Sequence, residues 1–439
     1  MNLEKVIKNF LIEHSCSLKP FLLGLSGGPD SLALFYLLLQ LKNENKLSFA
    51  VAHVNHNWRK ESSEEAHQLK LLAHEAQVSF HLHELDPEKL KGNLEEACRK
   101  ERLNFFKSLT DAYDYQAVFL AHHLNDQAET VLKRIFEGAF LPRCQGLSPV
   151  KEIDGLTIFR PFLKVQKAEI EKWLKEKGIQ AFEDPTNQDS QFMRARFRER
   201  IVPFLSKTFG KEIDKPLYRF GNQSFELDQY LKKAFFSYEE KIVKGFFGSY
   251  FTFPEGLLPF EIKYLIRMFA EKEEVLLTYP LIEAIASFIE SLAPNKQIEI
   301  EGKKLFVDRG TLFCLKDRNA FPFDGHLDMD TSSFNSANLS HWKITLSDGC
   351  EGQENWGWEE AFKGELSLKL LPGKYRIAFS DHHLNLKKLW SNAKVPAFLR
   401  GCYPLVIHNQ QLYADSLSKK KPFFNSSQQE FFKLDLCCC

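Results

Sequence analysis

The chain has 439 residues, which is long enough for two or three domains. Hydrophobic residues make up 44% of it and charged residues 26%, a balance that is typical of a globular protein with substantial cores. Its 58 basic and 58 acidic side chains give a formal net charge of zero, so overall charge does not indicate a nucleic-acid partner. Any site for RNA must therefore be a local basic patch.

The nine cysteines are scattered apart from Cys437, Cys438 and Cys439, and the sequence contains no CxxC pair. Neither a zinc knuckle nor a redox dithiol is therefore indicated, and scattered single thiols suit a reducing cytoplasm. The segment after Met1 lacks the apolar core of a signal peptide, and no stretch approaches the roughly 20 apolar residues of a membrane span. We expect a cytoplasmic protein that makes no membrane contact.

The N-terminal part of the chain alternates between strand and helix patterns. Apolar runs predict strands at 21–25, 47–56, 79–85 and 117–121, and amphipathic patterns predict helices at 3–15, 32–39, 62–77, 93–109 and 126–136. This alternation predicts an α/β fold with a doubly wound parallel sheet. Ligands of such sheets bind beyond the carboxyl ends of the strands.

A glycine-rich loop joins the first strand to its helix. It consists of Ser26, Gly27, Gly28, Pro29, Asp30 and Ser31. Glycines allow successive N–H groups to converge on one anion, and the helix adds its positive N-terminal end. The loop has neither the Walker spacing GxxxxGK[ST] nor the dinucleotide fingerprint GxGxxG. An ordinary turn is the alternative, but the fully polar loop between apolar runs favours a pyrophosphate cradle.

Polar side chains also follow two other predicted strands. His53 to His56 close the second strand, and His122 and His123 follow the fourth. Because the carboxyl ends of parallel strands meet at one edge of a sheet, we expect these clusters and the glycine loop to form one site. Without a third well-spaced donor, hydrogen-bonding roles for His122 and His123 are favoured over metal ligation.

Two predicted helices carry charged pairs near this edge. Asp126 and Glu129 lie three residues apart on one face, where they could bind an amine or a metal, or only offset the helix dipole. Arg99 and Arg102 likewise share a face of the helix before them, and an ordinary charged surface is the alternative.

A turn-rich segment, Glu183 to Asp189, precedes four alternating arginines, Arg194, Arg196, Arg198 and Arg200. Alternate residues share a face of a strand, whereas in a helix Arg194 and Arg198 would align. Either arrangement makes a basic surface that suits phosphates, and a solvated helix face is the alternative.

The remainder of the chain changes character. We predict a mainly helical central domain at 211–325, with helices at 217–245, 260–269 and 279–292 and short strands at 298–300, 304–307 and 311–315. The polar residues 329–339 predict a linker. An α+β C-terminal domain at 340–439 follows, with strands at 342–346, 366–371 and 405–413 and a helix near 384–400.

The motifs occur in a specific order along the chain. In these motifs and in their order the chain resembles the tRNA(Ile)-lysidine synthase family. The motifs are the loop SGGPDS, the string from His53 to His56 with Arg59, the helix with Asn93, Glu95, Arg99 and Arg102, HHLNDQAETVLKR, RPFL at 160–163, and DPTNQD followed by arginines. The resemblance covers 20–205 and resumes at Leu386–Leu389, Lys394–Pro396 and Leu399–Arg400. Ala195 departs from the family, in which Asn is common at this position.

The family resemblance implies a PP-loop domain at 1–210 that uses ATP and Mg²⁺. The implied reaction adenylates the wobble cytidine of tRNA(Ile) with a CAU anticodon, and the ε-amine of free L-lysine then displaces AMP to give lysidine. A homodimer is one assembly open to such a protein.

The resemblance also implies roles for individual residues. Ser26 to Ser31 and His53 would bind ATP, with Asp30 at the metal, and Arg102 would be a cationic group beside the phosphate. Asp126 and Glu129 would bind lysine, and one of them would accept a proton. The tRNA would contact Arg194, Arg196, Arg198, Lys387, Lys388 and Arg400.

Two alternatives remain open. Another adenylating tRNA-modifying enzyme, such as a thiolase, would usually need paired cysteines, which this chain lacks. A silent RNA-binding relative could have lost Asp30, Asp126 or Glu129, yet all three are present.

Overall fold

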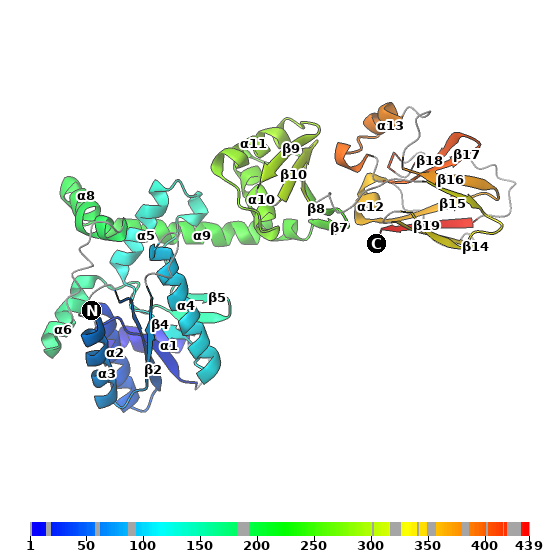
Figure 1. Ribbon diagram of the computed structural model, residues 1–439. Coiled ribbons are helices and arrows are strands. Elements are labelled where there is room, and N and C mark those ends of the chain that lie inside the picture. The colour runs from blue at the N-terminus through cyan, green and yellow to red at the C-terminus, as the bar shows by residue number, and fades with distance from the viewer. Residues whose placement is uncertain are drawn as a thin grey trace. The chain divides into compact units, whose positions relative to one another are not determined.

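The computed structural model describes most of the chain (Figure 1). The described residues are 2–14, 19–57, 62–86, 94–181, 193–300, 303–316, 326–339, 342–348, 357–379, 386–400, 403–415, 417–418 and 432–438. They form two compact units, Met1–Lys232 and Lys233–Cys439, and each unit is described by itself.

The first unit is built on a six-stranded sheet in the order β3-β2-β1-β4-β6-β5. Its first five strands in that order are parallel, and only β5 runs antiparallel, as a hairpin with β6. The strands are β1 Phe21–Gly24, β2 Phe49–Asn55, β3 Phe80–Glu84, β4 Val118–Phe119, β5 Val150–Ile153 and β6 Leu156–Phe159. The predicted parallel sheet is confirmed, and its order places β1 and β4 side by side at the centre.

Helices cover both faces of this sheet. One face packs against α1 Leu3–His14, α2 Pro29–Asn43, α3 Ser62–Glu75 and α6 Lys167–Lys177. Phe106 and Leu109 of α4, Leu94–Tyr113, pack against the other face. The long apolar run of α2 is buried on most sides, since Leu34, Phe35 and Leu38 are fully inaccessible. This burial holds the N-terminus of α2, and with it the glycine loop, against the end of β1.

The remaining helices of the first unit follow β4 or α6. They are α5 Leu124–Phe136, η2 Leu141–Arg143, α7 Met193–Arg196, the π-helical η4 Phe197–Ile201 and α8 Val202–Phe209, and α9 Asp214–Glu239 begins here. The arginines from Arg194 to Arg200 are therefore helical, which settles the choice between strand and helix. Arg194 and Arg198 belong to successive turns.

The described residues of the second unit form three antiparallel sheets. A five-stranded sheet, β7-β8-β11-β10-β9, is accompanied by α10 Pro259–Lys272 and α11 Tyr279–Glu290. Its strands are β7 Val243–Gly245, β8 Gly248–Thr252, β9 Lys296–Ile300, β10 Lys303–Asp308 and β11 Thr311–Leu315. The predicted helix over 217–245 is thus too long, because its last residues form β7.

Two four-stranded sheets, β12-β16-β17-β18 and β13-β14-β19-β15, share a core with the first. Trp342 and Tyr403 are fully buried in this core, with their ring centroids 5.0 Å apart. The elements are β12 His326–Asp330, β13 Ser336–Leu339, β14 Trp342–Asp348, α12 Trp358–Lys363, β15 Glu365–Leu370, β16 Lys374–Ala378, α13 Leu386–Asn392, η6 Ala397–Leu399, β17 Leu405–His408, β18 Gln411–Ala414 and β19 Phe432–Cys438.

Two expectations for this region were wrong. The polar residues 329–339 do not form a linker, because they contribute to β12 and β13. Both are edge strands, so their polar side chains remain hydrated while the backbone pairs with one neighbour. Residues 405–413 form a hairpin, β17 and β18, instead of one strand. None of the described helices is both long enough and apolar enough to cross a membrane.

Candidate functional site

The glycine loop has the backbone shape that its sequence predicts. Gly27 has a φ of 87°, in the left-handed region that favours glycine. Gly28 has an ordinary φ of −69° and caps the N-terminus of α2, and Pro29 occupies the first turn of that helix. The first N–H groups of a helix have no partner within the helix, so an anion at this end of α2 would meet free donors and the positive end of the helix dipole.

Ser31 makes hydrogen bonds to other residues of the glycine loop. Its hydroxyl donates to the carbonyl of Gly28 at 3.0 Å and accepts from the Ser26 N–H at 3.2 Å. The two hydroxyls of Ser26 and Ser31 are also 3.1 Å apart. Because Ser31 has a single proton, this arrangement commits it to Gly28. Ser31 therefore shapes the loop in this conformation. The Ser26 hydroxyl donates its own proton to Ser31, so the backbone of the loop remains to meet a ligand.

His53 supports the strand that enters the loop. Its side chain is buried at the end of β2, and its Nδ1 lies 2.8 Å from the carbonyl oxygen of Leu25. Burial lowers the pKa of His53, although the Leu25 carbonyl opposes this. The neutral ring can then donate from Nδ1 to Leu25 and leave Nε2 as an acceptor.

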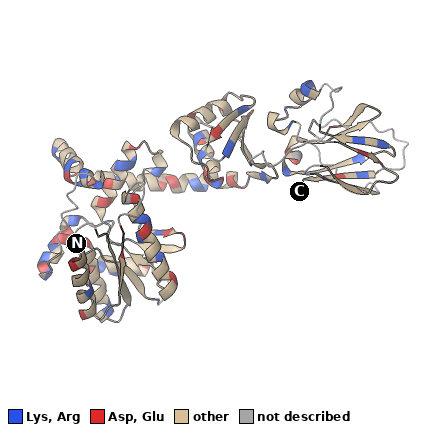
Figure 2. Ribbon diagram, viewed as in Figure 1, with Lys and Arg blue, Asp and Glu red and all other residues tan. Residues whose placement is uncertain are grey.

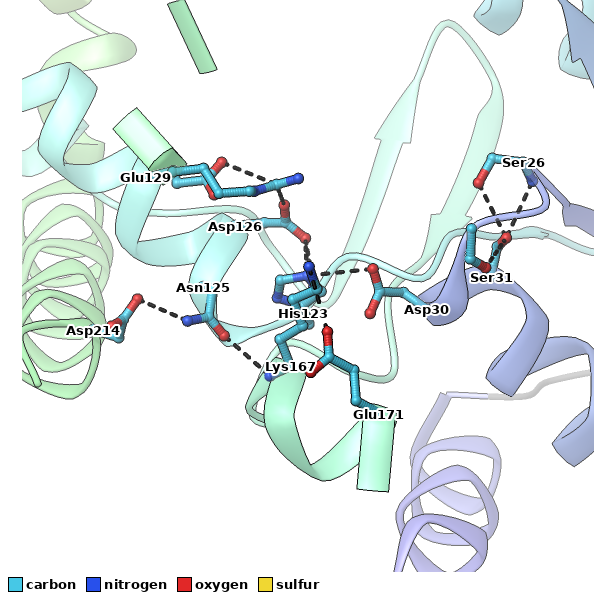
Figure 3. A network of polar contacts seen from close by, with 12 residues as sticks. Ser26, Asp30, Ser31, His123, Asn125, Asp126, Glu129, Lys167, Glu171 and Asp214 are labelled. Atoms are coloured by element: carbon cyan, nitrogen blue, oxygen red, sulfur yellow. Dashed lines mark hydrogen bonds and ion pairs between the residues drawn. The ribbon is translucent and has the colours of Figure 1, made fainter. Parts of the chain in front are cut away.

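His123 joins two of the predicted catalytic carboxylates. Its Nε2 lies 3.5 Å from Asp30 Oδ2 and 3.5 Å from Asp126 Oδ2, and its side chain is only 2% exposed. The backbone N–H of His123 also donates to Asp126 Oδ2 at 2.9 Å. Figure 3 shows Asp30, His123 and Asp126 lying between the loop residues Ser26 and Ser31 and the more distant Glu129. The residues after β1 and β4 thus meet in one site, as their strand-end positions predict.

Arg198 binds the carboxylate pair on α5. Its Nε donates to Glu129 Oε1 at 2.8 Å, and its Nη2 donates to Asp126 Oδ1 at 3.0 Å and to Glu129 Oε2 at 3.3 Å. The carboxylates are largely buried, with side-chain exposures of 15% for Asp126 and 7% for Glu129. The pair therefore binds a cation, which here is supplied by η4.

The charged side chains of this cluster shift one another's pKa values. Burial would lower the pKa of His123, but its contact with Asp30 and the charge of Asp126 raise this pKa. Burial would raise the pKa of Asp126, but the two histidines and Arg198 lower it. For Glu129 burial dominates and raises the pKa, against the opposing charge of Arg198. The two carboxylates therefore differ, with Asp126 the more firmly ionised.

A second polar group lies beside the first. Arg160, which is 4% exposed, donates from Nε to His122 Nδ1 at 3.2 Å and from Nη1 to the Ser148 carbonyl at 2.9 Å. Burial and the charges of Arg99 and Arg102 lower the pKa of Arg160 to about 10. Burial lowers the pKa of His122 to about 3, so the neutral imidazole serves as an acceptor. The predicted hydrogen-bonding roles of the two histidines agree with these contacts.

A cavity of about 440 Å³ adjoins the carboxylate pair, because Glu129 is part of its lining. We call it the basic cavity, since seven cationic side chains line it: Arg99, Lys133, Arg134, Arg143, Lys151, Arg160 and Arg194. Its other acidic residue, Glu137, pairs with Lys133 at 3.7 Å. Burial and four surrounding arginines lower the pKa of Lys151. Positive charges that repel one another in one hollow favour binding of an anion.

Arg102 lies close to two arginines that line the basic cavity, Arg99 and Arg194. Its Nε is buried and has no hydrogen-bond partner among the described residues. Burial lowers the pKa of Arg102, and the charges of Arg194 and Arg99 lower it further. Its predicted place beside a phosphate is compatible with this unpaired donor.

The residues predicted to contact tRNA have different surroundings. Arg194 lines the basic cavity and Arg196 is exposed, whereas Arg198 pairs with the carboxylates. In the second unit Lys387 and Lys388 are exposed on α13, which carries blue segments in Figure 2. Arg400 donates from Nε and Nη2 to the Val395 carbonyl at 3.1 and 2.8 Å, so it also stabilises its own turn.

Several site features lie outside the sequence predictions. Sequence reasoning did not predict the contact of Arg198 with α5. It also did not predict that Arg134, Arg143 and Lys151 line a cavity. The only sequence signal for them is local charge, which surface helices share. The DPTNQD motif, Arg59 and Asn93 lie outside the described residues, and the side chain of Glu95 does too.

Comparison with protein families gives two matches. The PP-loop domain family, ATP_bind_3, matches residues 1–205, which include the glycine loop and the carboxylate pair. The family described as the TilS substrate C-terminal domain matches residues 367–430.

Whole proteins give longer matches. The tRNA(Ile)-lysidine synthase of Protochlamydia amoebophila is 38% identical over 429 residues, which are 95% of this chain and 93% of that protein. The protein of the same name from Chlamydia pneumoniae is 40% identical over 216 residues, 49% of this chain and 66% of its own length. Among solved structures, the U34-tRNA thiolase NcsA from Methanococcus maripaludis has 16% identity and a TM-score of 0.42, covering 52% of this chain and 78% of its own. The predicted resemblance is confirmed, and the chain belongs to the tRNA(Ile)-lysidine synthase family.

Proposed function

We propose that this protein ligates free L-lysine to C2 of the wobble cytidine of tRNA(Ile) with a CAU anticodon, with ATP as the activating substrate. The observation that carries the proposal is the linked set of Asp30, His123 and Asp126 at the carboxyl edge of the sheet, which Arg198 connects to Glu129. The set extends from a phosphate-binding loop to a cation-binding pair beside the basic cavity. ATP, lysine and RNA phosphates each find a chemically suitable surface there.

ATP would bind with its phosphates at the glycine loop. The left-handed Gly27 turns the backbone so that the N-terminus of α2 points toward the ligand. Ser26 would turn its hydroxyl from Ser31 to a phosphate oxygen, and the buried His53 stabilises the loop through Leu25. The loop would stabilise the negative charge that develops on pyrophosphate as it leaves.

Mg²⁺ would bind at Asp30. The Oδ1 atom of Asp30 is buried and has no hydrogen-bond partner among the described residues, which suits a metal ligand. No group of three or more His, Cys, Asp or Glu side chains suited to a metal occurs in the described ranges. This fits Mg²⁺, which proteins often bind through one or two carboxylates together with substrate phosphates. When bound, the ion would neutralise phosphate charge.

Lysine would bind at Asp126 and Glu129. Both carboxylates already accept hydrogen bonds from a guanidinium, so their orientation suits a cationic ligand. The attacking ε-amine must lose a proton, and the raised pKa of Glu129 makes it the better proton acceptor of the two. Asp126, with its lowered pKa, would keep its charge and hold the ligand.

The tRNA would place phosphates of its anticodon loop in the basic cavity. Several of its cations bind neutral groups and keep their charge uncompensated: Arg160 donates to His122 and Ser148, and Arg134 donates to the carbonyls of Arg143 and Gln145. A cytidine must leave its stack to react, and arginine planes can support an unstacked base. Since Glu129 lines the cavity, the cytidine and the lysine would be neighbours.

The chemistry then has two displacements. The cytosine O2 attacks the α-phosphorus of ATP, the bond between that phosphorus and the bridging oxygen breaks, and pyrophosphate leaves. The neutral ε-amine next attacks C2, a C–N bond forms, and the C2–O2 bond breaks. AMP leaves with that oxygen, and the amine proton passes to Glu129. Positioning and charge stabilisation supply most of the acceleration in such transfers.

Transfer of labelled lysine tests the proposal. The full chain is incubated with labelled L-lysine, ATP, Mg²⁺ and tRNA(Ile) with a CAU anticodon, and acid-precipitable label is counted. We expect ATP-dependent incorporation into this tRNA and none into a matched tRNA with U at the wobble position. Absence of incorporation into the CAU tRNA would contradict the proposal.

A further inference from the structure

The segment 145–148 forms part of the lining of the basic cavity, to which all four of its residues contribute. We call it the wall loop. It belongs to no helix or strand. An irregular segment holds one shape only where its backbone groups find hydrogen-bond partners in other parts of the protein. The conformation of the wall loop therefore depends on side chains from the elements around it.

Gln127 of α5 binds both backbone groups of Leu147 in this loop. Its Nε2 donates to the Leu147 carbonyl at 2.7 Å, and its Oε1 accepts from the Leu147 N–H. Gln127 is 5% exposed and is not among the described residues that line the cavity, so it supports the loop from behind. The pairing needs an amide, because an ionised carboxylate has no proton to donate to the carbonyl.

The wall loop in turn orients two cations of the cavity. Arg160 donates from Nη1 to the Ser148 carbonyl at 2.9 Å, and Arg134 donates from Nη1 to the Gln145 carbonyl. Because loop carbonyls hold both guanidinium groups, a shift of the loop would move these cations with it. Gln127 is neutral, so it affects the cavity by fixing the place of other charges and adds none of its own.

The helix that holds the wall loop also carries the carboxylate pair. Gln127 lies between Asp126 and Glu129 in α5, and an α-helix fixes the spacing of residues within one turn. We infer that Gln127 is a positioning residue for the tRNA substrate. It fixes the wall loop, so that the cavity holds the anticodon loop in register with α5. This inference rests on the proposed function and gives a buried neutral side chain a part in RNA recognition.

Gly146 reaches the same contact from the loop side. A Cβ at this position would overlap Oε1 of Gln127 and would lie 2.7 Å from its Cδ and 3.4 Å from its Nε2. These three atoms are the nearest neighbours that such a Cβ would meet outside the adjoining residues. The φ of Gly146 lies outside the left-handed region, so its backbone conformation does not exclude alanine. Gly146→Ala should therefore act by displacing the side chain of Gln127.

The two positions can be tested against each other. The kcat/KM for tRNA and the KM values for ATP and lysine are measured for the wild type, Gln127→Ala, Gly146→Ala, their double variant and the control Gln223→Ala. Gln223 is exposed on α9. We expect each of the first two variants to lower kcat/KM for tRNA by about 10- to 100-fold, as lost hydrogen bonds and a small misplacement do. The KM values for ATP and lysine should change little, and Gln223→Ala should match the wild type.

The double variant gives the sharpest result. Gln127→Ala vacates the space that a methyl group on residue 146 needs, so adding Gly146→Ala to it should cost nothing further. Wild-type kinetics of Gly146→Ala alone would overturn the inference, and so would an additional loss in the double variant. Equal losses with tRNA, ATP and lysine would give Gln127 a general structural role.

A further variant covers the case in which Gln127→Ala or Gly146→Ala does not fold. Gln127→Met keeps the size of the side chain and loses both hydrogen bonds to Leu147, so it must lower kcat/KM for tRNA and leave the KM values for ATP and lysine nearly unchanged. Any other pattern in Gln127→Met would overturn the inference. Inactivity of the wild type with tRNA(Ile) would instead contradict the proposed function.

Discussion

The Nε atom of Arg198 donates a hydrogen bond to Oε1 of Glu129 at 2.8 Å, across 69 positions of sequence. The contact joins η4 to α5 and puts a guanidinium on a carboxylate that is almost fully buried. It shows that this end of the site accepts a cation. The position of Glu129 also links the cluster to the basic cavity, so one side chain belongs to both.

Replacement of Glu129 by glutamine should affect lysine more than ATP. Glu129→Gln removes the charge and the proton acceptor but keeps the size of the side chain, and a charge-assisted hydrogen bond contributes about 1.5–3 kcal/mol. We expect the KM for lysine to rise by roughly 10- to 100-fold, with a smaller change for ATP. The control is Glu176→Gln, an exposed carboxylate on α6. A parallel rise of both KM values would contradict the assignment.

The two glycines of the loop should respond differently to alanine. Gly27 has a φ of 87°, where a Cβ costs about 1–2 kcal/mol, so Gly27→Ala should lower both the melting temperature and pyrophosphate release. At Gly28 a Cβ would meet only Ser26 Oγ at 3.6 Å, an ordinary contact, and φ is −69°. Thermal unfolding of Gly28→Ala should therefore match the wild type. Equal losses of stability would show that the loop has another conformation.

The basic cavity should contribute to the salt dependence of tRNA binding. Lys151→Gln removes one cation from its lining, so we expect weaker binding and a slope of log K against log salt that is smaller by roughly one charge. Lys100→Gln provides the control, since Lys100 is exposed on α4 and does not line the cavity. An unchanged slope for Lys151→Gln would exclude this residue from the RNA contact.

His122 should make the protein sensitive to acid. Its pKa of about 3 lies below the ordinary 6.5, so the folded state resists protonation while the unfolded chain binds a proton. Stability should therefore fall as pH decreases below 6.5, by at most about 1.4 kcal/mol per pH unit for this group. His122→Asn keeps an acceptor for Arg160 without titrating. Unfolding between pH 7 and 4 should give a shallower slope for the variant, and identical slopes would contradict the account.

Local sequence patterns are sufficient to predict most of the strands and helices of the first unit. The alternating runs predict the parallel sheet because buried strands and amphipathic helices have distinct periodicities. The spacing of Asp126 and Glu129 predicts that they share a face of the helix just after β4, and only the family resemblance adds a role in binding lysine. The edge of the sheet at which the site lies follows from topology, since the glycine loop, the string His53 to His56 and the pair His122 and His123 each close or follow a parallel strand.

Tertiary contacts explain what could not be predicted. The pairing of Arg198 with Glu129 depends on how η4 folds back to α5, and nothing in a pattern of alternate arginines selects that partner. The cations that line the basic cavity come from elements that include α4, α5, β5 and α7. On each of these elements the charged residues are spaced as they are on an ordinary solvent-exposed face. The strands β12 and β13 resemble a linker because edge strands tolerate polar residues on both faces.

The order of the two displacements is the central claim, and it can be measured directly. The full chain is incubated with α-³²P-labelled ATP, Mg²⁺ and tRNA(Ile) with a CAU anticodon in the absence of lysine, and the label on the tRNA is followed before and after lysine is added. We predict that label becomes attached to the tRNA and is then released as AMP when lysine arrives. A tRNA that never acquires the label, or a labelled tRNA that lysine does not discharge, would contradict the account.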